Sequence, residues 1–148
     1  MNLTEVQITA YAKHFEEELF AKPLIAFSRD KTWTAKNFDA AAGIYAIYDK
    51  GALIYIGESA NVKLRMQEVK RTYNHTLKKI LNNLHFKGNL NGNKFSDVIE
   101  VKLNQYMLDH VTFKTKSLAF GRLEMEAMLI ERNPRVKNKK NKRNKTTK

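Results

Sequence analysis

Apolar side chains recur at helical spacing along the first twenty residues. They stand three or four positions apart: Ile8, Tyr11, Ala12, Phe15 and Leu19. Thr4 and Gln7 precede this stripe at the spacing of a helix capping box, and Pro23 follows it. We therefore predict an N-terminal amphipathic helix that ends before Pro23. Its apolar stripe is expected to pack against the rest of the chain or against a partner.

The pattern changes to strand-like segments between residues 43 and 57. The residues that favour strands there are Tyr45, Ile47, Ile54 and Ile56. Between them, Asp49-Lys50-Gly51 has turn chemistry, with a glycine that can adopt a positive φ. The segment predicts a β-hairpin. Upstream of it, three aromatic residues are expected to anchor residues 24–40 to the main domain: Phe27, Trp33 and Phe38.

Two short helices are expected after the hairpin, over residues 61–73 and 75–84. The second would carry one apolar face, made of Leu77, Ile80, Leu81 and Leu84. The glycines and asparagines between His85 and Lys94 favour a loop.

The last third of the chain predicts two strands and a helix. Val98–Leu103 and Val111–Thr115 alternate as strands do. From Ser117 onward the pattern becomes helical, and Pro134 is expected to end that helix.

Composition limits the class of protein. At 148 residues and 43% hydrophobic content, the chain fits one globular domain. No apolar run approaches the roughly 18 to 20 residues that a membrane helix requires, so we expect no contact with a membrane. The N-terminus does not have the pattern of a secretory signal. Cysteine is absent, which suits an intracellular, cytoplasmic location.

The charge of the chain favours a polyanionic partner. Lysine and arginine number 27 against 15 acidic residues, which gives a net charge of +12. Such an excess promotes binding to nucleic acid through phosphate neutralisation and counterion release. Eight of the basic residues, and no acidic ones, lie between Arg135 and Lys148. This tail is either a solvated terminus or a nucleic-acid contact.

Two tripeptides stand within the expected hairpin: Gly43-Ile44-Tyr45 and Tyr55-Ile56-Gly57. The segment GIYAIYDKGALIYIG resembles the opening hairpin of the GIY-YIG nuclease superfamily, and the resemblance covers residues 41–138. It implies an α/β (α+β) fold with a small, mainly antiparallel three-stranded sheet flanked by helices. Residues 1–40 would then form an N-terminal helical extension, and residues 139–148 a basic, disordered tail.

Phosphodiester hydrolysis needs an aligned water, stabilisation of the charge on the phosphate, and neutralisation of the leaving oxygen. Arg65 lies eight residues after Gly57, and the resemblance makes it the arginine that binds the phosphate. Glu126, followed by Pro134 and Asn138, resembles the closing element of the family, in which a glutamate binds the metal ion.

The helical register also favours Glu126 over its neighbours. Glu126 shares an apolar stripe with Leu123 and Ile130, whereas Glu124 and Glu131 are expected to face solvent. A single carboxylate with open water positions suits one Mg²⁺ (or Mn²⁺) ion.

The other site residues follow from the resemblance. Tyr45 would position or deprotonate the attacking water, Tyr55 would hydrogen-bond around the phosphate, and Asn138 would brace the site. His75 is either the family's more distant histidine or a surface residue that caps a helix. Without the residues that follow the hairpin, both tyrosines could equally be ordinary sheet residues.

Seven basic side chains are expected to contact DNA: Lys63, Lys70, Arg71, Lys139, Lys140, Lys142 and Arg143. The sequence thus predicts a metal-dependent endonuclease that hydrolyses DNA, a stand-alone enzyme of restriction, phage or mobile-element type. Two alternatives remain open. One is a structure-specific repair nuclease whose N-terminal helix docks on a protein partner or on a second copy of the chain. The other is an inactive nucleic-acid-binding module.

Overall fold

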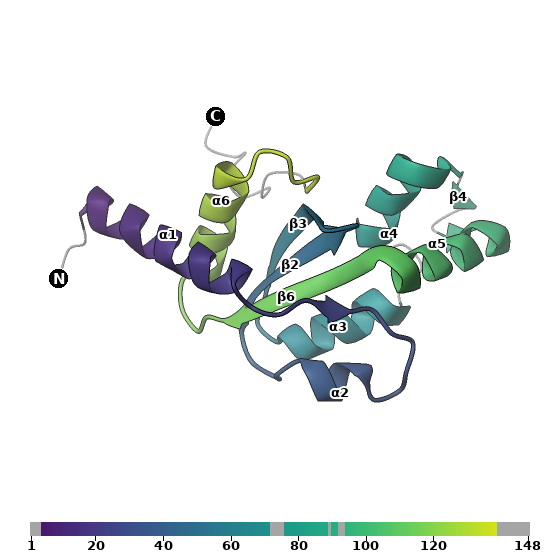
Figure 1. Cartoon of the computed structure of the whole chain (residues 1–148), viewed down its shortest axis with the longest axis horizontal. Coiled ribbons are helices and arrows are strands. Elements are labelled where there is room, and N and C mark those ends of the chain that lie inside the picture. Colours follow the sequence, from purple (N-terminus) through teal and green to yellow (C-terminus); the bar gives the residue numbers. More distant parts are fainter. Residues whose placement is uncertain (1–3, 72–75, 89, 92–93, 139–148) are drawn as a thin grey trace.

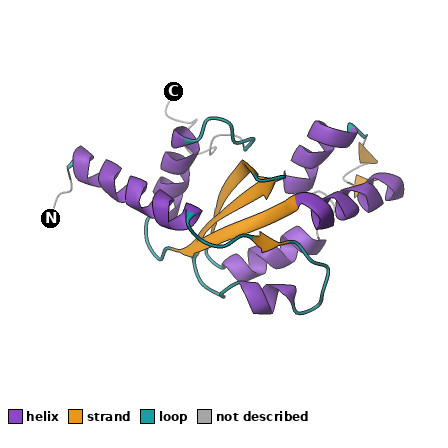
Figure 2. Ribbon diagram, viewed as in Figure 1, coloured by secondary structure: helices purple, strands orange, loops and turns teal. Residues whose placement is uncertain are grey.

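The computed structural model describes residues 4–71, 76–88, 90–91 and 94–138. Its centre is an antiparallel sheet with helices on both faces (Figures 1 and 2). The strand order is β1-β6-β2-β3. These strands span Ile25–Ala26 (β1), Val111–Ser117 (β6), Gly43–Asp49 (β2) and Ala52–Ser59 (β3). The predicted α+β class is confirmed. The sheet has four strands rather than three, because the two residues of β1 pair with β6.

The helices surround this sheet in two groups. They are α1 (Glu5–Phe20), α2 (Trp33–Asn37), α3 (Val62–Arg71), α4 (Thr76–Leu81), α5 (Asp97–His110) and α6 (Arg122–Arg132). A π-helical turn, η1 (Asn82–Phe86), continues α4, and β4 (Leu90–Asn91) pairs with β5 (Lys94–Phe95). Among the described helices, none is both long enough and apolar enough to cross a membrane.

Each face of the sheet has its own hydrophobic core. On one face, residues of α2 to α5 pack around Phe113, and the three predicted aromatic anchors, Phe27, Trp33 and Phe38, are buried there. On the other face, α1 and α6 pack over Ile44, Ala46 and Ile56. All seven residues of β2 are buried, because β2 lies inside the sheet and both of its faces are covered.

The predicted hairpin is present. Lys50 and Gly51 both have positive φ, at 50° and 82°, as a tight two-residue hairpin turn requires. The strand register shifts between Ile47 and Tyr48: Tyr55 pairs with Ile47 and Leu53 pairs with Tyr48. Ile54 is therefore an extra residue in β3, which has the form of a β-bulge.

The N-terminal helix begins as predicted, since Thr4 and Gln7 form a capping box. Ala12, Phe15 and Leu19 are buried. Ile8 and Tyr11 do not pack on the rest of the chain: they are exposed because the first two turns of α1 extend beyond the sheet (Figure 1).

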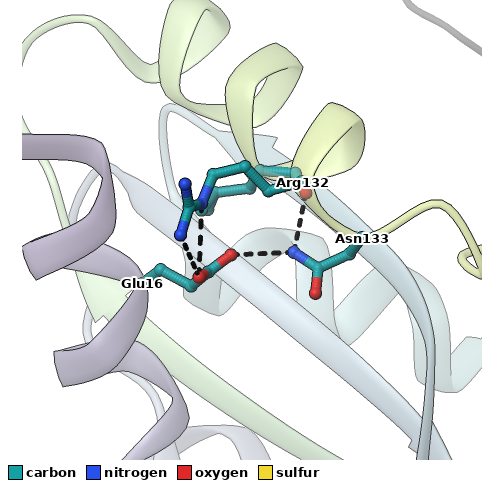
Figure 3. Close-up of polar contacts among 4 residues, drawn as sticks. Glu16, Arg132 and Asn133 are labelled. Atoms are coloured by element: carbon teal, nitrogen blue, oxygen red, sulfur yellow. Dashed lines mark hydrogen bonds and ion pairs between the residues drawn. The ribbon is translucent and has the colours of Figure 1, made fainter. Parts of the chain in front are cut away.

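A polar junction joins α1 to the end of α6 (Figure 3). The Glu16 carboxylate accepts hydrogen bonds from the Arg132 guanidinium, at 3.0 and 3.3 Å, and from Asn133 Nδ2, at 2.9 Å. Asn133 Nδ2 also donates to the carbonyl of Leu129, so the junction closes the C-terminal turn of α6. Residues distant in sequence thus hold α1 onto the body of the protein.

Several boundaries differ from those predicted. Val98–Leu103 is not a strand but part of α5, whose N-terminus is capped when the Ser96 hydroxyl accepts from the Ile99 N–H. Short-range alternation concealed a longer helical repeat, in which Leu103 and Met107 are buried four residues apart. Ser117 ends β6, and the last helix starts only at Arg122, after Gly121 adopts a positive φ.

The prediction of a loop between His85 and Lys94 was wrong in part. It contains the end of η1 and the short β4–β5 pair. Leu77 and Leu81 are buried as predicted, but Leu84 is exposed because the wider π-turn changes its direction.

A buried carboxylate fastens η1 and α5 to the end of β2. Asp49, only 8% exposed, accepts from the Tyr106 hydroxyl at 2.7 Å and lies 2.7 Å from His85 Nε2. The His85 ring stacks on that of Tyr106, with centroids 4.4 Å apart. Burial and the hydrogen bond to Asp49 both raise the pKa of Tyr106. These bonds position the whole η1 segment.

We predict that Asp49→Ala lowers the free energy of unfolding by about 2–3 kcal/mol, because it removes the two hydrogen bonds that tie a buried carboxylate to Tyr106 and His85. Urea denaturation measures this change. Asp109→Ala is the matched control: Asp109 is an exposed aspartate of α5, bonded only to Gln105 among the described residues, and its loss should cost less than about 0.5 kcal/mol. Equal costs at the two positions would refute the structural role of Asp49.

Candidate active site at the edge of the sheet

The tyrosines of the two tripeptides come together on one face of the hairpin. Tyr45 in β2 pairs with Gly57 in β3. Tyr55 is also in β3, two residues before Gly57. The two rings are stacked, with centroids 6.0 Å apart and planes 20° from parallel. Diagonal pairs of this kind bring side chains together across antiparallel strands.

Close packing requires glycine in both tripeptides, at Gly57 against the Tyr45 ring and at Gly43 against the neighbouring strand. A Cβ atom at Gly57 would lie 2.3 Å from Tyr45 Cζ and 2.4 Å from its hydroxyl oxygen. A Cβ atom at Gly43 would lie 2.6 Å from the carbonyl oxygen of Lys116 in β6. The glycine of the second tripeptide thus makes room for the tyrosine of the first.

Arg65 and Glu126 approach the tyrosines from two different helices. The charge of Arg65, on α3, lowers the pKa of both tyrosines, and the charge of Glu126, on α6, raises both. Both side chains are partly buried. Glu124 and Glu131 are exposed, as the register predicted. The structure therefore brings four of the six predicted catalytic residues into one electrostatic environment.

Arg65 keeps unused hydrogen-bonding capacity. Its Nη1 lies 3.2 Å from the Glu68 carboxylate on the same helix. Its Nε is buried and has no hydrogen-bond partner among the described residues. The side chain as a whole is 38% exposed, so the accessible part of the guanidinium can bind a phosphate oxygen.

Burial keeps the tyrosine hydroxyls protonated. It raises the pKa of Tyr45 well above its usual value of 10, and the pKa of Tyr55 rises for the same reason. The neighbouring Tyr55 hydroxyl adds to this rise at Tyr45. At neutral pH both groups are therefore neutral hydrogen-bonding hydroxyls.

Asn138 fastens the C-terminal segment to the outer edge of β3. Its side-chain oxygen accepts from the Ile56 N–H at 3.3 Å, and its Nδ2 donates to the Ile56 carbonyl. The Lys137 N–H donates to the Ile54 carbonyl at 2.7 Å. These bonds hold the backbone on both sides of Tyr55, which is the bracing contact expected of Asn138.

The predicted DNA-binding residues of α3 have different surroundings. Arg71 is exposed, whereas Lys63 and Lys70 are partly buried. Lys70 already donates to the Asp30 carbonyl, which ties α3 to the segment before α2. Five predicted residues lie outside the described part of the chain: His75, Lys139, Lys140, Lys142 and Arg143.

An ion pair beside the site was not predicted. Arg122 Nε lies 3.2 Å from the Glu58 carboxylate, and both side chains are mostly buried. Glu58 directly follows Gly57, and Arg122 is one helical turn before Glu126. These two spacings were the available signals, although only the fold places residues 64 positions apart in contact.

Groups of three or more His, Cys, Asp or Glu side chains that could hold a metal ion do not occur in the described part of the chain. Glu126 can still hold a hard cation, since Mg²⁺ often binds through one carboxylate, waters and substrate phosphates. Comparison of the chain with family models, curated proteins and solved structures found no match. The functional argument therefore comes from the residues of this site.

We predict that Gly57→Ala destabilises the protein by about 1–3 kcal/mol, because the new methyl group overlaps the Tyr45 ring. In a Tyr45→Ala background the overlap disappears, and the same change should stabilise by about 0.5 kcal/mol, since alanine suits a strand better than glycine. Urea denaturation of all four proteins gives the coupling free energy. An equal effect of Gly57→Ala in both backgrounds would show that the close approach is unimportant.

Proposed function

We propose that this protein is a metal-dependent endonuclease that hydrolyses phosphodiester bonds of DNA, as the resemblance to the GIY-YIG superfamily implies. The observation that carries the proposal is the convergence of Tyr45, Tyr55, Arg65 and Glu126 on one edge of the sheet. Two hydroxyls and one guanidinium, together with a cation held by one carboxylate, can supply the oriented water and the charge stabilisation that in-line attack on a phosphodiester requires.

The groups would divide the work as follows. Arg65 would bind non-bridging phosphate oxygens through the exposed part of its guanidinium and stabilise the charge that develops in the transition state. The tyrosine hydroxyls would orient the attacking water and the phosphate. Because burial raises the pKa of Tyr45, its neutral state favours water positioning over proton abstraction, the two roles that the resemblance offers. Glu126 would hold Mg²⁺ (or Mn²⁺), which, when bound, supplies Lewis-acid stabilisation.

Electrostatics support a polyanionic substrate. The chain carries a net charge of +12, so 12 of its 27 basic side chains remain in excess after each of its 15 carboxylates is matched with one of them. Phosphate neutralisation by such an excess is independent of base sequence. The chemistry of the site and the charge of the chain therefore favour the same class of substrate.

We predict that Glu126→Gln abolishes plasmid cleavage and leaves the fold and DNA binding nearly intact. The amide keeps the shape of the side chain but loses the charge that holds the cation. The assay is conversion of supercoiled plasmid to nicked and linear forms in Mg²⁺, with EDTA as the blank.

Glu124→Gln is the matched control for this experiment. Glu124 lies on the same helix two residues earlier and is exposed, so its substitution should leave the cleavage rate within about twofold. Wild-type cleavage by Glu126→Gln would remove the carboxylate from the mechanism. Absence of cleavage by the wild-type protein in Mg²⁺ and Mn²⁺ would overturn the proposed activity.

We predict that deleting residues 139–148 weakens DNA binding for all sequences and flattens its salt dependence. The deletion removes six basic residues: Lys139, Lys140, Lys142, Arg143, Lys145 and Lys148. Each phosphate contact contributes a slope of about −0.9 in log K against log salt, so two or three contacts change it by roughly 2 to 3 units. Titrations at several salt concentrations measure the slopes, and parallel lines would mean that the body alone binds DNA.

A further inference from the structure

Phe120 is the most exposed of the large apolar side chains in the described part of the chain, at 88%. It lies in the four-residue connection between β6 and α6. Single exposed apolar residues are common and need no explanation by themselves. Phe120 differs because its backbone is held in place and because it lies beside the candidate site.

The connection that carries Phe120 is anchored on both sides. The Leu118 N–H donates to the Ala42 carbonyl at 2.9 Å, and the Leu118 side chain packs on the core under α6. After Phe120, Gly121 adopts a φ of 75° and its carbonyl accepts the first hydrogen bond of α6, from the Met125 N–H. The backbone therefore holds the Cα atom of Phe120 at a defined place, from which the ring extends into solvent.

A short series of contacts leads from this loop to the stacked tyrosines. Ser117 pairs with Gly43, which also pairs with Ser59, so the loop leaves the sheet at the end where β3 finishes. Arg122, two residues after Phe120, is paired with Glu58 of β3. Glu58 follows Gly57, on which the Tyr45 ring lies.

Small exposed residues flank Phe120: Ser117, the last residue of β6, and Ala119 in the loop. They do not extend the ring into an apolar patch. The nearest basic side chains in the sequence, Lys116 and Arg122, are paired with Glu18 and Glu58. A single ring is too small a surface for a protein partner, but it is large enough to stack on one base. The net charge of +12 on the whole chain also favours a nucleic acid.

We propose that Phe120 is a base-contacting wedge, which stacks on a nucleobase beside the phosphate held by Arg65 and Glu126. This inference rests on the proposed function, since it requires DNA in the candidate site. The ring would fix the register of the strand along the edge of β3. The identity of the unstacked base would then influence where the protein cuts, because some base steps unstack more easily than others.

The first test is the affinity of Phe120→Ala for duplex DNA, measured by fluorescence anisotropy in EDTA so that no cleavage occurs. Loss of one stacked base should raise Kd by about 5- to 150-fold. Val101→Ala is the control, because Val101 is also exposed, at 68%, but lies on α5 at the other end of the sheet. It should leave Kd unchanged. An unchanged Kd for Phe120→Ala would overturn the wedge.

The second test places a fluorescent indole at the same position. DNA should quench the new emission of Phe120→Trp and shield it from acrylamide, whereas Val101→Trp should be unaffected. The native Trp33 is buried and gives the background, which the wild-type protein measures. Equal quenching at both positions, or at neither, would overturn the wedge.

The two proposals fail differently. If the wild-type protein binds and cuts DNA but the Phe120 variants behave as wild type, only the wedge is wrong. If the wild-type protein does not bind DNA in either assay, the proposed function and the wedge are both wrong.

Discussion

The candidate site depends on one close contact, the Tyr45 ring lying over the backbone of Gly57. The two residues are paired across antiparallel strands, and a single additional methyl group would enter the space of the ring. The contact sets where the Tyr45 hydroxyl lies, and Tyr55, Arg65 and Glu126 all influence the pKa of that hydroxyl. The burial that this packing brings is also the largest cause of the raised pKa of Tyr45. The position of the Tyr45 hydroxyl and its raised pKa therefore have the same origin.

Sequence was a good guide to the local elements of the fold. The capping box at Thr4, the hairpin and the solvent-facing positions of Glu124 and Glu131 follow from spacing within a few residues. Prediction failed at Val98–Leu103, where alternation over six residues concealed a fourteen-residue helix. A short window cannot distinguish the two periods, and tertiary packing of Leu103 and Met107 decides between them.

The site could be predicted only as a set of residue types. The register of α6 selected Glu126, but the ion pair between Glu58 and Arg122 arises from a contact across 64 positions, which no local pattern encodes. The direction in which burial moves the tyrosine pKa values is likewise a property of the packed state. The ion pair and the tyrosine pKa values at the candidate site thus depend on tertiary structure, which the two tripeptides alone do not reveal.

The bond between Asn138 and Ile56 has a consequence for synthesis and association of the chain. It joins residues 82 positions apart, so the ribosome must release nearly the whole described chain before the outer edge of β3 is closed. Until then, the strand that carries Tyr55 presents unpaired N–H and C=O groups, to which another nascent chain can add a strand. Closure by Asn138 therefore protects the folded protein from edge-to-edge association at the position of its candidate site.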